Sequence, residues 1–97
     1  MKAYELLYFV APTTDEDARA GIVERVRGVI ADSEGTLDNI DEWGTRKLAY
    51  EINGLSDADY TLIDFHSSPE SIAELDRVLR INDAVMRHMI VARTDRD

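Results

Sequence analysis

The chain has 97 residues, 44% of them hydrophobic, which suits one folded domain, leaves no room for a second and excludes intrinsic disorder. It contains no cysteine, which excludes disulfides and thiolate metal sites, and it has no apolar run near the roughly 20 residues that a membrane-spanning helix needs. Its net charge of −9 disfavours binding to a polyanion, but the charge is uneven: residues 1–45 carry a net −6 and residues 77–93 a net +3.

The first predicted element is a strand over Lys2–Val10. Both of its faces are substantially apolar, which is typical of a central strand. A helix follows, with Thr14 as its N-cap and several aliphatic residues at helical spacing. Gly35 is predicted to end this helix in the left-handed conformation.

The first ten residues are too short and too quickly polar for a signal peptide, so we expect a cytoplasmic protein.

The middle of the chain is predicted to be extended. Strands are expected over residues 36–43 and 46–52, with a bulge or bend at Gly44 between them. Residues 53–59 are polar and predict a turn, and residues 60–66 alternate as a third strand. The last two strands of this group therefore form a hairpin.

A second helix and a fourth strand complete the chain. Ser68 is predicted to cap the helix, with proline at the first helical position. The pair Asn82-Asp83 ends it, and Met86–Arg93 is the final strand. The polar tail over residues 94–97 is expected to fray.

The predicted order of elements is β-α-β-β-α-β. Two helices cannot cover both faces of a four-stranded sheet, so both are expected on one face. This is the ferredoxin-like, split βαβ sandwich of the α+β class, formed by residues 1–97 as a single domain. Right-handed crossovers put the first and third strands in the middle of an antiparallel sheet and leave its other face uncovered.

Two segments resemble a known family. Residues 42–53 read EWGTRKLAYEIN, which is similar to that family's signature of a glycine, a basic pair and then Leu-Ala-Tyr-x-Ile. Residues 80–87 read RINDAVMR, which is similar to its Arg-x-Asn-Asp-x-Val-x-Arg stretch. With these motifs in order along the whole chain, the sequence resembles ribosomal protein six of the bacterial small subunit.

The resemblance implies a ferredoxin-like fold, a location on the ribosome, no catalytic residues and no cofactor. It also implies binding to the central domain of small-subunit ribosomal RNA together with ribosomal protein eighteen. The family often has Arg or Lys at the positions of Ala3 and Thr45, so fewer phosphate contacts are expected here.

Five basic residues are candidates for RNA contacts. Arg46 and Lys47 follow the predicted bend, where both can reach phosphates, although a basic pair at an edge also discourages aggregation. Arg80 follows the second helix, where a cation also complements the helix dipole. Lys2 and Arg87 begin antiparallel neighbouring strands, so they are expected at opposite ends of the sheet. We therefore expect a band of contacts around the rim.

Five apolar residues are predicted on the uncovered face of the sheet: Leu7, Phe9, Leu62, Met89 and Val91. A contiguous apolar cluster on a surface marks an interface, and the resemblance makes this one a surface for the protein partner. A one-residue error in the assignment of faces would instead bury some of these side chains. The same face would also serve a homodimer.

Other residues that often form sites are given structural roles. His66 and His88 have no second ligand at metal spacing, so no metal site is expected. The acidic pairs at residues 41–42 and 57–59 are expected in solvated loops. Trp43 is predicted to pack beside the bulge. The central strands are expected to lack the paired aromatics on which an RNA-recognition motif stacks bases.

Two rival functions remain open. A small hydrolase of the acylphosphatase kind needs an Arg in the loop after the first strand, and Ala11–Asp15 contains none. A protein-only interaction module joined through the uncovered face fits the acidity but not the two matching segments. The chain has no recognisable Ser/His/Asp set and no Gly-rich phosphate loop, so neither an enzyme nor a small-molecule substrate is expected.

Overall fold

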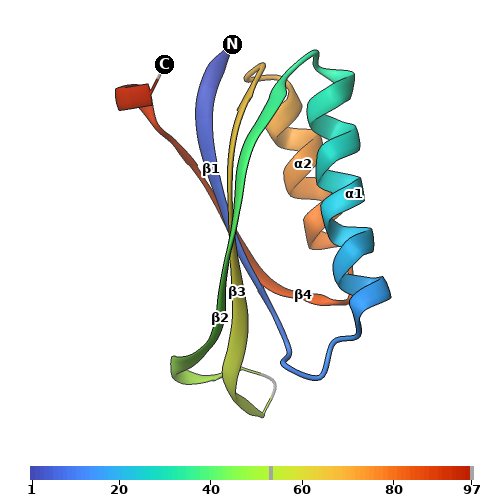
Figure 1. Ribbon diagram of the computed structural model, residues 1–97, viewed down its shortest axis with the longest axis vertical. Coiled ribbons are helices and arrows are strands. Elements are labelled where there is room, and N and C mark those ends of the chain that lie inside the picture. Colours follow the sequence, from blue (N-terminus) through green and yellow to red (C-terminus); the bar gives the residue numbers. More distant parts are fainter. Residues whose placement is uncertain (53, 97) are drawn as a thin grey trace.

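The computed structural model describes residues 1–52 and 54–96. In chain order, its elements are β1 (Lys2–Val10), α1 (Glu16–Asp32), β2 (Thr36–Ile52), β3 (Leu55–Ser67), α2 (Ser71–Arg80), β4 (Val85–Ala92) and a short 3-10 turn, η1 (Thr94–Arg96). The strands form one antiparallel sheet in the order β2-β3-β1-β4, and both helices cover the same face (Figure 1). The predicted ferredoxin-like α+β fold is confirmed, with β1 and β3 in the middle of the sheet.

The start of α1 differs by one residue from the prediction. Asp15, not Thr14, is the N-cap, and its carboxylate accepts a hydrogen bond from the amide of Ala18 at 2.8 Å. A carboxylate caps at least as well as a hydroxyl, and its charge also favours the positive end of the helix dipole. The cap therefore lies one residue later than the sequence pattern indicated.

The end of α1 corrects the role predicted for Gly35. The residue in the left-handed region is Glu34, with φ 62°. Gly35 is needed because an added Cβ would lie 2.2 Å from the backbone oxygen of His66. The glycine therefore lets the chain that enters β2 pass directly against the end of β3.

The hairpin of β2 and β3 is longer than predicted. β2 is one strand of 17 residues with a register shift between Glu42 and Gly44, and Gly44 has φ 77°, so the predicted bulge is confirmed. The predicted polar turn is wrong over residues 55–59, which belong to β3; Asn53 lies outside the described residues. Pairing with the second half of β2 outweighs the weak strand propensity of the polar residues there. The hairpin projects beyond the helices (Figure 1).

The second half of the chain follows the prediction with small shifts. α2 begins at Ser71, whose amide donates to the carbonyl of Ser68 at 3.1 Å, so Ser68 closes a turn before the helix and does not cap it. β4 lies one residue earlier at each end than the predicted Met86–Arg93. Residues 94–96 of the tail form the η1 turn, and position 97 lies outside the described residues. The fraying of the tail stays a prediction.

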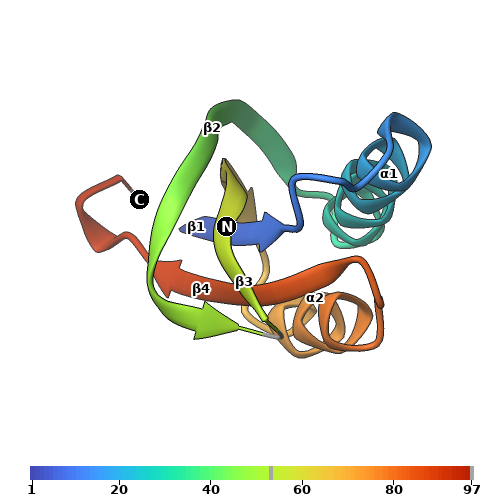
Figure 2. The ribbon, with the colours of Figure 1, turned by 90° about the horizontal axis from the view of Figure 1, so that it is seen from below.

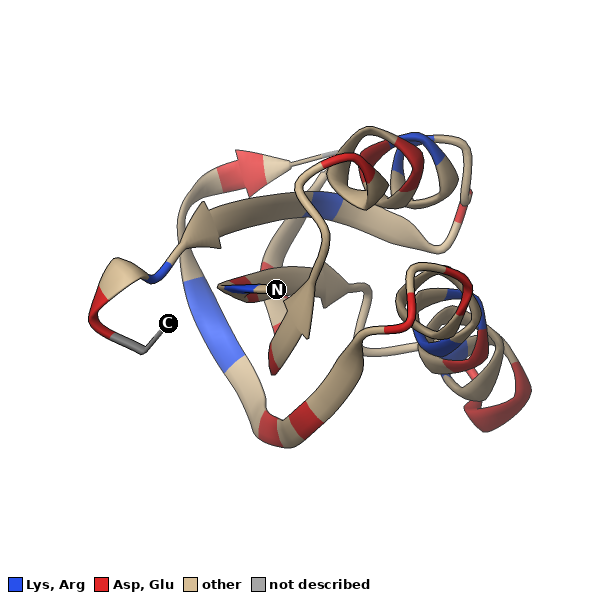
Figure 3. Ribbon diagram, turned by 90° about the horizontal axis from the view of Figure 1, so that it is seen from above, with Lys and Arg blue, Asp and Glu red and all other residues tan. Residues whose placement is uncertain are grey.

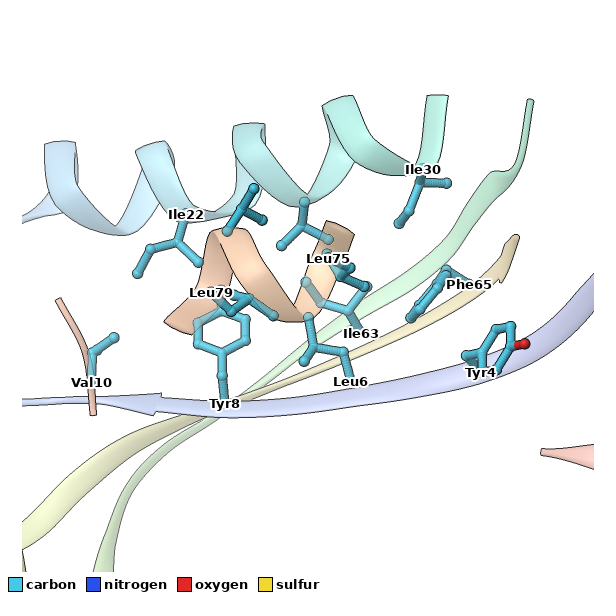
Figure 4. Close-up of a cluster of buried hydrophobic side chains, with 12 residues drawn as sticks. Tyr4, Leu6, Tyr8, Val10, Ile22, Ile30, Ile63, Phe65, Leu75 and Leu79 are labelled. Carbon is cyan, nitrogen blue, oxygen red and sulfur yellow. The ribbon is translucent and has the colours of Figure 1, made fainter. Parts of the chain in front are cut away.

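The core lies between the sheet and the two helices (Figure 4). Alternate residues of β1 point toward the helices, and Phe65 of β3 is 1% exposed among them. The buried cluster comprises Tyr4, Leu6, Tyr8, Val10, Ile22, Val26, Ile30, Ile63, Phe65, Leu75, Val78 and Leu79. Because side chains alternate along a strand, the intervening residues of β1 and β3 lie on the other face of the sheet, which is called the open face below.

Candidate RNA and protein interface

The predicted placement of the five apolar residues on the open face is confirmed by the strand registers. Leu7 of β1 pairs with Leu62 of β3 and with Met89 of β4, so three apolar side chains form one row across the sheet. Met89 is 59% exposed. Phe9 and Val91 lie on the same face in the adjacent rows. The open face therefore carries a contiguous apolar patch that the helices do not cover.

Three rings form an aromatic row that begins in this patch: Phe9, Tyr60 and Trp43. The ring centroids of Phe9 and Tyr60 are 4.8 Å apart, and those of Tyr60 and Trp43 are 6.1 Å apart. The expectation that the central strands lack paired aromatics is wrong, because Phe9 and Tyr60 are such a pair. Since the rings stack on one another, with interplanar angles of 15° and 21°, their inner faces are already covered. The row therefore differs from a flat platform for bases.

Trp43 packs beside the bulge as predicted. Its ring stacks on Tyr60, and its indole Nε1 donates a hydrogen bond to the Asp41 carboxylate at 3.1 Å. The expectation of a solvated loop for residues 41–42 is wrong, because both lie in β2.

The other half of the open face is polar and acidic. Glu5 of β1 pairs with Asp64 of β3, and both carboxylates lie on this face. Arg93 forms an ion pair with Glu5 at 2.9 Å. The Asp38 carboxylate lies 2.5 Å from Nδ1 of His66. The open face therefore changes from apolar to acidic along the strands, which suits a partner with apolar and basic side chains.

The basic pair Arg46-Lys47 lies on β2 beyond the Gly44 bulge, and both side chains are exposed. The Arg46 guanidinium donates a hydrogen bond to the carbonyl of Thr45 at 3.2 Å. Within residues 1–52 and 54–96, neither Arg46 nor Lys47 forms an ion pair. Figure 3 shows this basic stretch apart from the helices, on which basic and acidic residues alternate. Both charges are therefore available to phosphate groups.

The far part of β2 curves back toward β4 (Figure 2). The Tyr50 hydroxyl accepts a hydrogen bond from Nη1 of Arg87 at 3.1 Å, and the guanidinium carbon lies 5.7 Å from the ring centroid. Arg87 is thereby held at the end of the sheet that carries the basic pair. Lys2 pairs with Ser67 at the other end, so the predicted separation of Lys2 and Arg87 is confirmed.

Arg80 is the last residue of α2 and is less free than the other candidates. Its guanidinium pairs with Asp76 at 2.9 Å, and Asp76 also contacts Nε2 of His88 at 2.7 Å. The hydrogen bond from His88 and the charge of Arg80 lower the pKa of Asp76.

Each of the two histidines contacts a carboxylate on another element: His88 contacts Asp76, and His66 contacts Asp38. In the described part of the chain, no group of three or more potential ligands is placed to hold a metal ion.

Asp59 ties the hairpin to α1, which the sequence did not indicate. Its carboxylate accepts hydrogen bonds from the Thr45 hydroxyl at 2.5 Å and from Nη2 of Arg19 at 2.7 Å. The hydrogen bond from Thr45 lowers the pKa of Asp59 most, and the hydrogen bond and charge of Arg19 lower it further. The expectation of a solvated loop for residues 57–59 is therefore wrong. Thr45 supports the hairpin beside the basic pair through this hydrogen bond.

Asp59→Asn is expected to destabilise the protein by about 1–2 kcal/mol at neutral pH. A carboxylate with a lowered pKa in the folded chain contributes stability above its unfolded pKa, near 3.8, and this stability is lost as the pH falls through the lower folded value. Urea unfolding should therefore show a difference between the two chains that shrinks as the pH falls below 3.8 and is lost below the folded pKa of Asp59. Asp57→Asn, at an exposed neighbour, is the control. Parallel pH profiles of the parent and Asp59→Asn would contradict the prediction.

The loop after β1 is not arranged as a phosphate site. Arg19 reaches it from α1, but its guanidinium donates to the carbonyls of Thr14 at 2.8 Å and Pro12 at 3.3 Å as well as to Asp59. These acceptors occupy the charge that an acylphosphatase-like site would direct at its substrate.

In the described part of the chain, no helix combines the length and the apolar character needed to cross a membrane.

Comparisons with known proteins cover almost the whole chain. The family model of ribosomal protein S6 matches residues 3–92. The small ribosomal subunit protein bS6 of Clostridium novyi is 48% identical over 91 residues, which are 94% of this chain and 96% of that protein. The crystal structure of 30S ribosomal protein S6 from Thermotoga maritima has a TM-score of 0.86 at 33% identity and covers 97% of this chain and 89% of its own.

A more distant likeness shows the fold alone. The C-terminal domain of the MgtC protein from Mycobacterium tuberculosis has a TM-score of 0.63 at 12% identity, with 97% of this chain and 89% of that domain covered. Assignment to a family therefore rests on the sequence matches, which include both motif segments. The chain belongs to the ribosomal protein S6 family, and it is a structural component of the small ribosomal subunit, located on the cytoplasmic ribosome and not an enzyme.

Proposed function

We propose that this chain binds the central domain of small-subunit ribosomal RNA together with ribosomal protein eighteen. The observation that carries the proposal is the separation of two surfaces: exposed basic residues at the hairpin end and an apolar patch on the open face. The basic surface suits an RNA and the apolar surface suits a protein. A chain that carries both surfaces can therefore join an RNA to a second protein.

The basic residues supply the RNA contacts in this proposal. Arg46 and Lys47 have no ion pair among the described residues, and Tyr50 holds Arg87 at the same end of the sheet. Such side chains position a protein on phosphates without reading bases. Lys2 extends the contact at the other end of the sheet, and Arg80 joins when RNA phosphate replaces part of its pairing with Asp76.

The open face supplies the contact with ribosomal protein eighteen. The row of Leu7, Leu62 and Met89 forms the apolar centre, and the acidic half with Glu5 and Asp64 lies beside it. A basic partner bound there would neutralise part of the net charge of −9 and would bring its own cations to the RNA. The acidity of the chain is then compatible with RNA binding.

The double variant Arg46→Ala, Lys47→Ala is expected to weaken binding to a central-domain RNA fragment about tenfold and to reduce the slope of log affinity against log salt by about 2. Each cation that neutralises a phosphate releases bound counterions, so two lost contacts change both quantities. Binding would be measured over a salt series, with and without ribosomal protein eighteen. Arg25→Ala, Arg27→Ala on α1 removes the same charge and should leave the slope unchanged.

Two outcomes would count against the proposal. If the folded chain binds the fragment neither alone nor with ribosomal protein eighteen, the RNA contact is wrong. If the isolated chain instead forms a homodimer that survives dilution, the open face serves a protein-only module.

A further inference from the structure

A pocket of about 300 Å³ lies between α1 and β2, on the helix side of the sheet. α1 contacts the edge strand β2, and the pocket lies beside this contact, lined by residues of α1, β1, β2 and β3. Its floor is apolar and belongs to the core: Tyr8 and Ile22 are 4% and 1% exposed, and Ile40 is half-buried. This surface, called the α1–β2 pocket, is separate from both surfaces of the proposed function.

The rim of the α1–β2 pocket is acidic. Glu16 and Glu24 come from α1 and Glu42 comes from β2. Glu42 pairs with Thr61, which lies on the same face of β3 as the buried Ile63, so its side chain is directed to the helix side.

The charges of these carboxylates are not neutralised nearby. Glu24 has a distant contact with Arg27 at 3.9 Å, and within residues 1–52 and 54–96 neither Glu16 nor Glu42 forms an ion pair. The pocket's cation, Arg19, is already paired with Asp59.

The negative charge reaches the floor of the pocket. Burial raises the pKa of the Tyr8 hydroxyl, a hydrogen bond with Thr61 lowers it, the charge of Glu42 raises it, and the charge of Arg19 lowers it to a smaller extent. Glu42 is thus close enough to the buried floor to affect it electrostatically.

We propose that the α1–β2 pocket receives a cationic side chain, lysine or arginine, of a neighbouring protein in the small subunit. The apolar floor suits the methylene stem of such a side chain, and the rim carboxylates suit its charged head. RNA does not fit, because three carboxylates repel phosphate at short range. A bare metal ion or a small hydrophilic cation would make no use of the buried floor.

The test labels carboxylates in small ribosomal subunits that contain this chain and in the free chain. A water-soluble carbodiimide with glycine ethyl ester converts exposed carboxylates to amides, and mass spectrometry gives the rate at each residue. In the subunit, the labelling rates of Glu16 and Glu42 are expected to fall about tenfold, because a docked side chain excludes solvent and reagent. Asp17, which is exposed and does not line the pocket, should change little.

The same reagent without the ester supplies a second readout. It joins a carboxylate directly to a lysine amine in contact with it, so a docked lysine would yield a cross-linked peptide that names the partner. Glu42→Gln is expected to loosen the docked side chain and raise the labelling rate of Glu16 in the subunit about two- to fivefold. Asp17→Asn, the matched control, should not.

Equal labelling of Glu16 and Glu42 in the free chain and the subunit would overturn the proposal. Protection that vanishes on ribonuclease digestion, while the proteins stay bound, would assign the cover to RNA and also overturn it. Protection that survives digestion and weakens in Glu42→Gln supports it. None of these readouts depends on the basic pair or the open face, so this proposal and the proposed function fail independently.

Discussion

Gly35→Ala should destabilise the protein by about 3 kcal/mol or more. An alanine Cβ would lie 2.2 Å from the backbone oxygen of His66 and 3.1 Å from both Ile30 Cγ2 and Ser67 Cα. A side chain can turn away from such a contact, but a carbonyl held in a strand cannot. The chain would therefore have to move the end of α1 away from β3, which disturbs the partly buried hydroxyl contact of Ser33 with Ser67 at 2.7 Å.

Gly28→Ala is the matched control and is expected to change stability in the opposite direction. Gly28 lies inside α1, and a Cβ there would meet no atom within 4 Å. Alanine in an unobstructed helix position is more favourable than glycine by about 0.5–1 kcal/mol. Urea unfolding followed by circular dichroism measures both changes. Equal effects of the two substitutions would show that the close approach at Gly35 is not the cause.

Met89→Asp is expected to weaken binding to ribosomal protein eighteen by about 2 kcal/mol or more, roughly thirtyfold, with little effect on folding. Met89 is 59% exposed in the free chain, so its loss removes little burial. In the complex, the new carboxylate would lose its water at the β4 end of the apolar row, next to a half of the face that is already acidic. Isothermal titration of the two proteins measures the change.

Ile81→Asp provides the comparison. Ile81 is also 59% exposed, but it follows α2 and does not lie on the open face. The two variants make the same chemical change at positions of equal exposure, so a general effect of surface charge would appear in both. If Met89→Asp binds ribosomal protein eighteen as tightly as the parent chain, the partner surface lies elsewhere.

The order of elements and the faces of the strands were predictable because they follow local periodicity. Apolar residues at period two assigned Leu7 and Met89 to the open face, and the registers place them side by side. The bulge at Gly44 was likewise visible as a glycine within an extended pattern. Whether the candidate residues contact RNA and a partner follows from the resemblance, not from the geometry, and stays a prediction.

Contacts between distant parts of the chain were not predictable. Arg19 and Asp59 are separated by 40 positions, and nothing near either residue indicates the other. The stacking of Phe9 on Tyr60 depends on the register of β1 against β3, which two correct strand assignments do not determine. The close approach at Gly35 was not predictable for a similar reason. A glycine in a sequence can indicate either a left-handed backbone or a contact too close for a Cβ, and the sequence does not distinguish the two.

Trp43, the single tryptophan of the chain, offers an internal optical probe of one surface. Its indole stacks on Tyr60 at the end of the aromatic row and remains 38% exposed, so emission should respond when the open face is covered. Glu42 directs its side chain to the other side of the sheet, where the α1–β2 pocket lies. A single unlabelled sample can therefore distinguish the two docking events: fluorescence should change when a partner covers the open face and stay constant when a cation enters the pocket.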